Sequence, residues 1–181
     1  MADPTGWERV HDVVDLTDRT RDASFDVRFV HAGAGLAEEV AELMQALRQG
    51  QVQRVYEEAA DVLWYIAQME VCLHVAGRPV QWQAPGADIP KGALIDYVVA
   101  VAGAMKRWAR DAEIPGARAA AYTRIAEALP GLRLTVCLAC YATSVADLAQ
   151  VLELKHAAKI TAELERRAGL RAERAPEVRH V

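Results

Sequence analysis

Cysteine and aromatic residues are scarce in this chain of 181 residues. Its three cysteines, Cys72, Cys137 and Cys140, are too few for a disulfide framework and one short of a four-thiolate zinc site. Aromatic residues make up 6% of the chain, whereas Ala, Leu, Val, Glu and Arg are abundant, and this composition favours helix over sheet. We therefore predict an all-α protein with reduced thiols.

Long apolar runs and blocks of positive charge are also missing. No run reaches the roughly 18 apolar residues that a membrane-spanning helix needs, and residues 1–14 carry charged side chains in place of an apolar signal region. Acidic residues number 25 against 21 basic ones, a formal net charge of −4, and no basic block could follow a phosphate backbone. The sequence thus predicts a cytoplasmic protein with no membrane and no nucleic-acid partner.

The 52% apolar content excludes a disordered chain and supports a sizeable core. Apolar residues recur at spacings of three and four between widely spaced Gly and Pro residues, which predicts five or six amphipathic helices. They span residues 7–16, 25–48, 52–76, 92–112, 117–129 and 132–168, with a break at Pro130 and Gly131 and a second one near Ser144, whose pairing with Asp147 is typical of an N-cap.

The breaks in the pattern also suggest a division of the chain. Residues 1–20 would form an N-terminal helix and turn, residues 21–168 a single helical-bundle domain, and residues 169–181 a flexible tail. A shift of 70 residues lays 102–104 on 32–34 with identical Ala-Gly-Ala sequences, and the order of helices and breakers repeats as well. We therefore predict repeat-like halves at 22–90 and 92–168.

Two pairs of carboxylates stand one helical turn apart. Glu39 and Glu42 share one helix face, and Glu58 and Asp61 share a face of the next helix. A hairpin that turns at Gly50 would bring these faces together, and four carboxylates in one groove repel one another unless cations neutralise them. Oxygen-only ligands select Mg²⁺ or Mn²⁺ rather than zinc.

An exposed polar helix face is the other interpretation of these acids. Small residues such as Ala34, Ala41 and Ala59 surround them, however, and Asp61 directly precedes the apolar run 62–67. Carboxylates within an apolar helix face are costly unless they have a function. The pattern therefore favours a site.

The segment 35–69 resembles the MazG-like all-α nucleoside triphosphate pyrophosphohydrolases, a superfamily that also includes dimeric dUTPases and phosphoribosyl-ATP pyrophosphohydrolase. The signature of this family is EExxE followed by ExxD, and both parts are present as Glu38, Glu39 and Glu42 and as Glu58 and Asp61. Residues 144–160 are similar to the family's closing helix, in which NxxK is common. Here His156 replaces the Asn, and Lys159 follows.

The resemblance implies Mg²⁺-dependent hydrolysis of a nucleoside triphosphate between its α and β phosphates, which gives a monophosphate and pyrophosphate. It also implies metal ligands at Glu39, Glu42, Glu58 and Asp61, with the adjacent Glu38 as the base that activates water. Further candidates for substrate binding are Lys106, Arg107, His156, Lys159 and Trp64. For Lys106 and Arg107 the alternative is a solvated basic patch, and for Trp64 it is core packing.

The second half lacks this chemistry, because the shift of 70 places Trp108, Ala109, Ala112, Ala128 and Gly131 opposite the five acids. Family members commonly build their core from two subunits, so a degenerate second half could supply the same surface within one chain. A homodimer is the other expectation. The alternative function is a non-catalytic helical interaction or regulatory protein that keeps a metal-binding acidic groove. The base and sugar of the substrate stay open.

Overall fold

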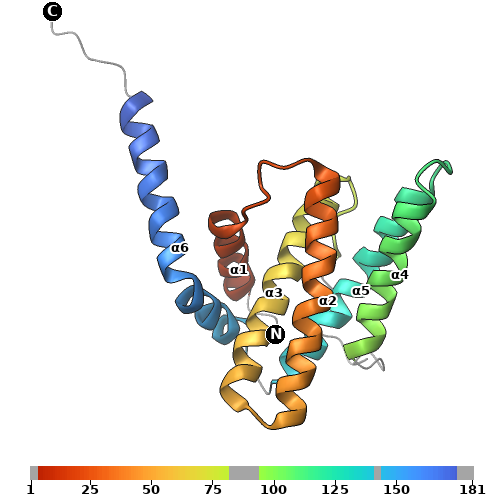
Figure 1. The fold of residues 1–181 in the computed structure, drawn as a ribbon, viewed down its shortest axis with the longest axis horizontal. Helices are drawn as coiled ribbons and strands as arrows, with labels where there is room; N and C mark the ends of the chain where they lie inside the picture. Colours follow the sequence, from red (N-terminus) through yellow and green to blue (C-terminus); the bar gives the residue numbers. More distant parts are fainter. Residues whose placement is uncertain (1–3, 82–93, 141–143, 175–181) are drawn as a thin grey trace, which may run out of the picture.

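The computed structural model describes residues 4–81, 94–140 and 144–174, and the regular structure of these ranges is helical (Figure 1). The predicted all-α fold is confirmed. Residues 175–181 of the predicted tail lie outside these ranges. The described helices are α1 (Pro4–Thr17), α2 (Phe25–Gln49), α3 (Val52–Val75), α4 (Leu94–Arg110), α5 (Ala117–Ala139) and α6 (Val145–Arg174).

Helices α2 and α3 form a hairpin whose ends the sequence specifies locally. Ser24 caps α2 by accepting a hydrogen bond from the Val27 amide through its side chain. Gly50 ends the helix at φ 64°, a left-handed conformation that glycine adopts without steric cost. Helix α3 begins two residues later, as the breaker pattern predicted.

Helix α3 lies at the centre of the bundle. It packs against α2, α1, α6 and α5, and Figure 1 shows α1 and α6 on one side of it and the α4–α5 pair on the other. Buried residues occur all around the helix, including Leu63, Ile66, Met69 and Leu73. A helix that is apolar on every side belongs in a core, which explains why the acids of α3 are buried as well.

Helix α5 runs through Pro130, so the predicted break at Pro130 and Gly131 is wrong. Proline removes a helical hydrogen bond and normally ends or kinks a helix. Here the residues on both sides, Leu129 and Leu132, are fully buried, and the ring of Tyr97 from α4 lies directly against Gly131. Packing of this continuous apolar face outweighs the local cost of the proline.

Helix α6 begins where the sequence predicted and ends later. The Ser144 hydroxyl accepts from the Asp147 amide at 3.3 Å, and the Asp147 carboxylate accepts from the Ser144 amide at 3.1 Å, which is a capping box. The helix continues past Gly169 to Arg174, so residues 169–174 are helical and not part of a flexible tail. Figure 1 shows this outer half extending beyond the other helices.

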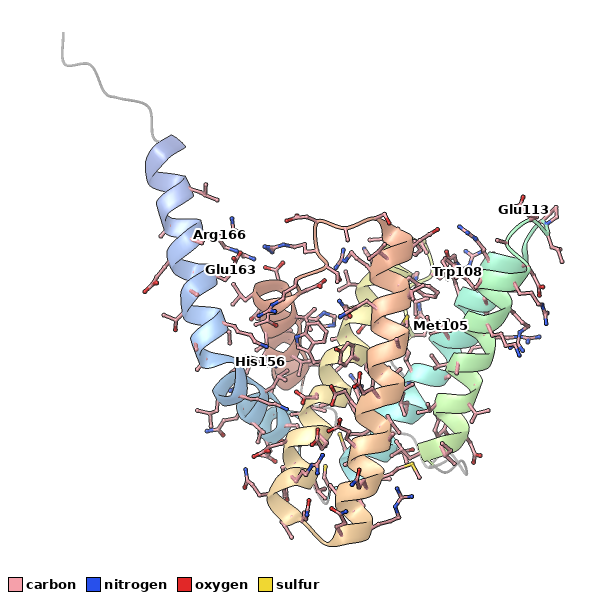
Figure 2. The ribbon with its side chains drawn as sticks, viewed as in Figure 1. Met105, Trp108, Glu113, His156, Glu163 and Arg166 are labelled. Atoms are coloured by element: carbon pink, nitrogen blue, oxygen red, sulfur yellow. The ribbon has the colours of Figure 1, made fainter. Side chains whose placement is uncertain are left out.

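The α2–α3 hairpin and the second hairpin, formed by α4 and α5, meet between α2 and α4. Gly33 of α2 lies against the Met105 side chain, and Phe29 contacts Trp108 with ring centroids 4.9 Å apart; Figure 2 shows Met105 and Trp108 in this interface. No described helix is long and apolar enough to cross a membrane.

Gly6 allows α1 and α6 to come together at backbone distance. A Cβ atom at Gly6 would lie 2.6 Å from the Ala146 backbone nitrogen, so Gly6→Ala forces the helices apart. We expect this substitution to lower the free energy of unfolding by about 1 to 2 kcal/mol, as measured by urea denaturation. Gly169→Ala is the matched control, because nothing lies within 4 Å of Gly169 and alanine favours helix by about 1 kcal/mol. A Gly6→Ala protein as stable as the parent would contradict this account.

Candidate metal centre and adjoining pocket

Three carboxylates converge between α2 and α3. One oxygen each from Glu39, Glu58 and Asp61 lies within 4.8 Å of the others. Glu58 and Asp61 are 7% and 8% exposed, and Glu39 is half-buried. The spacing of Glu58 and Asp61 places both on one face of α3, and the turn at Gly50 brings Glu39 opposite them. The oxygen-only ligand set fits a hard divalent cation such as Mg²⁺.

Glu42 does not join this cluster. The Arg54 guanidinium donates to Glu42 Oε2 at 3.1 Å and to Glu58 Oε1 at 2.9 Å, and it thereby holds Glu42 at the edge of the group. Arg54 lies one turn before Glu58 on α3, an i,i+4 position that the acidic signature does not reveal. Glu38 is exposed and is not part of the pocket wall.

A pocket of about 320 Å³ opens beside Glu39 and Asp61. Helix α6 contributes three side chains, and the others come from α1, α2, α3 and the connection between α1 and α2. Its lining residues are Thr17, Arg19, His31, Glu39, Asp61, Trp64, Tyr65, Lys155, His156 and Lys159. The acids therefore face cations from a helix almost 100 positions further along the chain.

The cationic wall belongs to α6. The Lys155 ammonium donates to Asp61 Oδ2, and His156 Nε2 lies 3.9 Å from Asp61 Oδ1. His156 Nδ1 is buried and has no hydrogen-bond partner among the described residues. The sequence indicated His156 and Lys159 but not Lys155, although its position four residues before Lys159 puts both lysines on one helix face.

Aromatic rings line another part of the pocket. Trp64 Nε1 donates to Thr17 Oγ1 at 2.8 Å, and the Trp64 and Tyr65 rings make a T-shaped contact at 4.8 Å. Gly35 leaves the space on α2 that the Tyr65 ring occupies. Trp64 is mostly buried and also lines the pocket, so its position is compatible with both interpretations that the sequence left open.

The connection between α1 and α2 brings Arg19 to the pocket. Asp18 holds this connection, since its carboxylate accepts from the Thr20 amide at 2.7 Å and from the Arg28 guanidinium at 2.9 Å. The buried Gln68 donates to Thr20 Oγ1 at 3.1 Å and so links the connection to α3. No motif in the sequence marks Arg19 or Thr17.

Lys106 and Arg107 are not part of this pocket. They lie on α4, which packs against α2 and α5, and α4 turns Ala104 and Trp108 toward the core while Lys106 stays exposed. The pocket opens instead toward α6. The structure therefore does not bring Lys106 and Arg107 to the site, because α6 occupies the side of the acids on which the pocket opens.

The acids carry negative charge that the surrounding residues do not fully balance. Burial, and then the charges of Asp61 and Glu58, raise the pKa of Glu39 to about 7. Burial raises the pKa of Asp61 as well, although the Lys155 ammonium acts in the opposite direction. Burial and the neighbouring charges of Lys159 and Lys155 lower the pKa of His156 to about 4. A site of this kind gains from a cation.

The fold and site define an all-α domain with a buried carboxylate cluster on a helical hairpin. Residues 31–74 match the family model of the MazG nucleotide pyrophosphohydrolase domain, and this range contains Glu39, Glu58 and Asp61. The MazG-like resemblance is thereby confirmed over residues 31–74. Comparisons with curated proteins and with solved structures gave no significant match.

The raised pKa of Glu39 makes the stability of the metal-free protein depend on pH. The folded state holds the Glu39 proton more tightly than the unfolded state does, so this contribution is lost as pH rises from about 4.5 to about 7. Glu39→Gln removes this pH-dependent loss of stability, so at pH 8 the variant should be more stable than the parent by about 1 to 2 kcal/mol. At pH 4.5 the two proteins should differ little in stability. Urea denaturation with a chelator present measures this.

Glu57→Gln is the control for that comparison, because Glu57 lies outside the cluster and accepts a hydrogen bond from Gln53. It should show no such gain at pH 8. A Glu39→Gln protein less stable than the parent at pH 8 would contradict the charge imbalance described above.

Proposed function

We propose that the protein is a Mg²⁺-dependent nucleotide pyrophosphohydrolase, which cleaves a nucleoside triphosphate or related nucleotide between its α and β phosphates. One observation carries the proposal: a single pocket combines two carboxylates of the cluster, Glu39 and Asp61, with cations and aromatic rings. The family match over the hairpin that bears the acids supports the same reaction class. In a nucleotide complex the metal ion would face the carboxylates, the phosphates would face the cations, and the nucleobase would face the aromatic rings.

The carboxylates would hold the ion. Glu39, Glu58 and Asp61 are the proposed ligands, and Mg²⁺ or Mn²⁺ bound there supplies positive charge that stabilises the phosphate oxygens. In this proposal Glu42 keeps Arg54 in place and so fixes Glu58, because the guanidinium bridges the two carboxylates. This differs from the fourfold ligand set that the family resemblance implies.

The cations would receive the phosphates. Lys159 and Arg19 line the pocket and form no ion pair with the described residues, so their charges are available to an anion. The lowered pKa of His156 keeps its ring neutral at pH 7, and its buried Nδ1 without a partner can serve the substrate as a hydrogen-bonding group. Trp64 and Tyr65 offer aromatic surface to a nucleobase.

Glu38 is the proposed proton acceptor. It is exposed and adjoins Glu39 in the chain. Burial and the charges of Glu39, Asp61 and Glu38 raise the pKa of Tyr65, so the charge of Glu38 acts within the pocket. A carboxylate in this position can accept a proton from the attacking water.

Turnover tests the proposal directly. The protein is incubated with Mg²⁺ and a panel of canonical and modified nucleoside triphosphates, and pyrophosphate release is measured. We expect release from at least one nucleotide and a loss of about 100-fold or more in kcat for Glu39→Gln and Asp61→Asn. Glu57→Gln should retain the activity of the parent.

Absence of pyrophosphate from every nucleotide would overturn the enzyme proposal. If the protein then still binds Mn²⁺, the non-catalytic regulatory alternative explains the carboxylate cluster better. Turnover by Asp61→Asn at the parent rate would exclude the cluster as the site.

Lys159 should contribute to substrate binding through its charge. We expect Lys159→Met to raise KM by about tenfold or more, because one charge-assisted contact to a phosphate is lost. Arg124→Met removes an exposed cation from α5, outside the pocket, and should leave KM unchanged. An equal rise in KM for both variants would indicate long-range attraction in place of a contact.

A further inference from the structure

Lys155 takes the position beside the acids that a bound cation would need. Its ammonium contacts Asp61, and its side chain is 39% exposed. Arg54 pairs with Glu58 on the other side, whereas Glu39 has no hydrogen-bond or ion-pair partner among the described residues. The protein therefore brings its own cations to two of the three carboxylates in the cluster.

The contacts of these two internal cations differ in a way that bears on metal binding. Arg54 is on the same helix as Glu58, at i,i+4, and bridges Glu58 Oε1 and Glu42 Oε2. Lys155 comes from α6, reaches Asp61 with a flexible side chain and lines the pocket. Of the two, Lys155 is the one that can move without disturbing the α2–α3 hairpin.

We infer that Lys155 is a resident counter-ion of the metal site, which a divalent cation must displace from Asp61 in order to bind. The inference rests on the proposed function in one respect, namely that the cluster binds a metal. Two positive charges at one carboxylate repel each other, and the Lys155 ammonium already donates to Asp61 Oδ2. Lys155 thus weakens metal binding to the free protein.

After its displacement from Asp61, the Lys155 ammonium would have a second partner within the pocket. The pocket next to it also contains Lys159 and would hold the anionic part of a substrate. A phosphate there gives Lys155 a new partner, so metal and substrate binding support each other. Lys155 would in this way favour metal binding in the presence of substrate over metal binding alone.

The test is calorimetric titration of the metal-free protein with Mn²⁺ alone. We expect Lys155→Met to bind Mn²⁺ about tenfold or more tightly than the parent, because a competing charge is gone. Lys155→Arg keeps the charge and should stay within about threefold of the parent. Arg124→Met controls for the change in net charge and should bind as the parent does.

Stability provides a second readout that a merely structural lysine would not give. Without metal, Lys155→Met should melt at a lower temperature than the parent, since Asp61 loses its partner. With saturating Mn²⁺ the order should reverse, because tighter binding adds stability. Lys155→Gln serves the same purpose if the methionine variant does not fold.

The inference would be overturned if a folded Lys155→Met or Lys155→Gln protein bound Mn²⁺ as the parent does or more weakly. It would also be overturned if Arg124→Met bound Mn²⁺ more tightly by the same factor, or if neither the parent nor any variant bound Mn²⁺. The outcome is separate from that of the activity test. If Lys155→Met binds Mn²⁺ more tightly but the protein releases no pyrophosphate, the counter-ion inference is supported and the enzyme proposal is overturned. If the protein turns over a nucleotide but Lys155→Met binds Mn²⁺ with unchanged affinity, the enzyme proposal is supported and the counter-ion inference is overturned.

Discussion

The concentration of negative charge between α2 and α3 is the constraint on which the rest of the structure depends. Glu39, Glu58 and Asp61 lie close together in an environment with little water, where repulsion is strong and solvation is weak. Folding such a group is unfavourable unless cations stand beside it. Arg54 from the same hairpin and Lys155 from a distant helix meet that need in part, and the remaining imbalance favours a metal ion.

The helices around the hairpin can be understood from this requirement. Lys155, His156 and Lys159 reach the acids because α6 is fixed against α1, and α1 against α3. Arg9 donates two hydrogen bonds to Glu153, and Gly6 permits backbone contact with α6. Further out, Glu163 accepts from Arg21 of the connection between α1 and α2, and Arg167 donates to Asp15 of α1. These contacts hold the cationic wall in position opposite the acids.

The α4–α5 pair has a different role, since it covers the other side of the α2–α3 hairpin without adding acids to the cluster. Its contact with α2 is aromatic: Phe29 packs against Trp108 and Tyr122, and the Arg118 guanidinium lies 4.6 Å from the Trp108 ring. The division into an acidic half and a half that supplies packing surface stays a prediction. Burial of the hairpin's inner face also explains how α5 tolerates Pro130.

The sequence by itself determined the helices, the hairpin turn and the position of the acids, because helical period, the Ser24 and Ser144 caps and the left-handed Gly50 are encoded within a few residues. Only the tertiary structure decided which charges meet. It joined Lys155 to Asp61, turned Glu42 toward Arg54, kept Lys106 and Arg107 away and carried α5 through Pro130. Such outcomes depend on packing between segments far apart in the chain, and a local pattern contains no record of that packing.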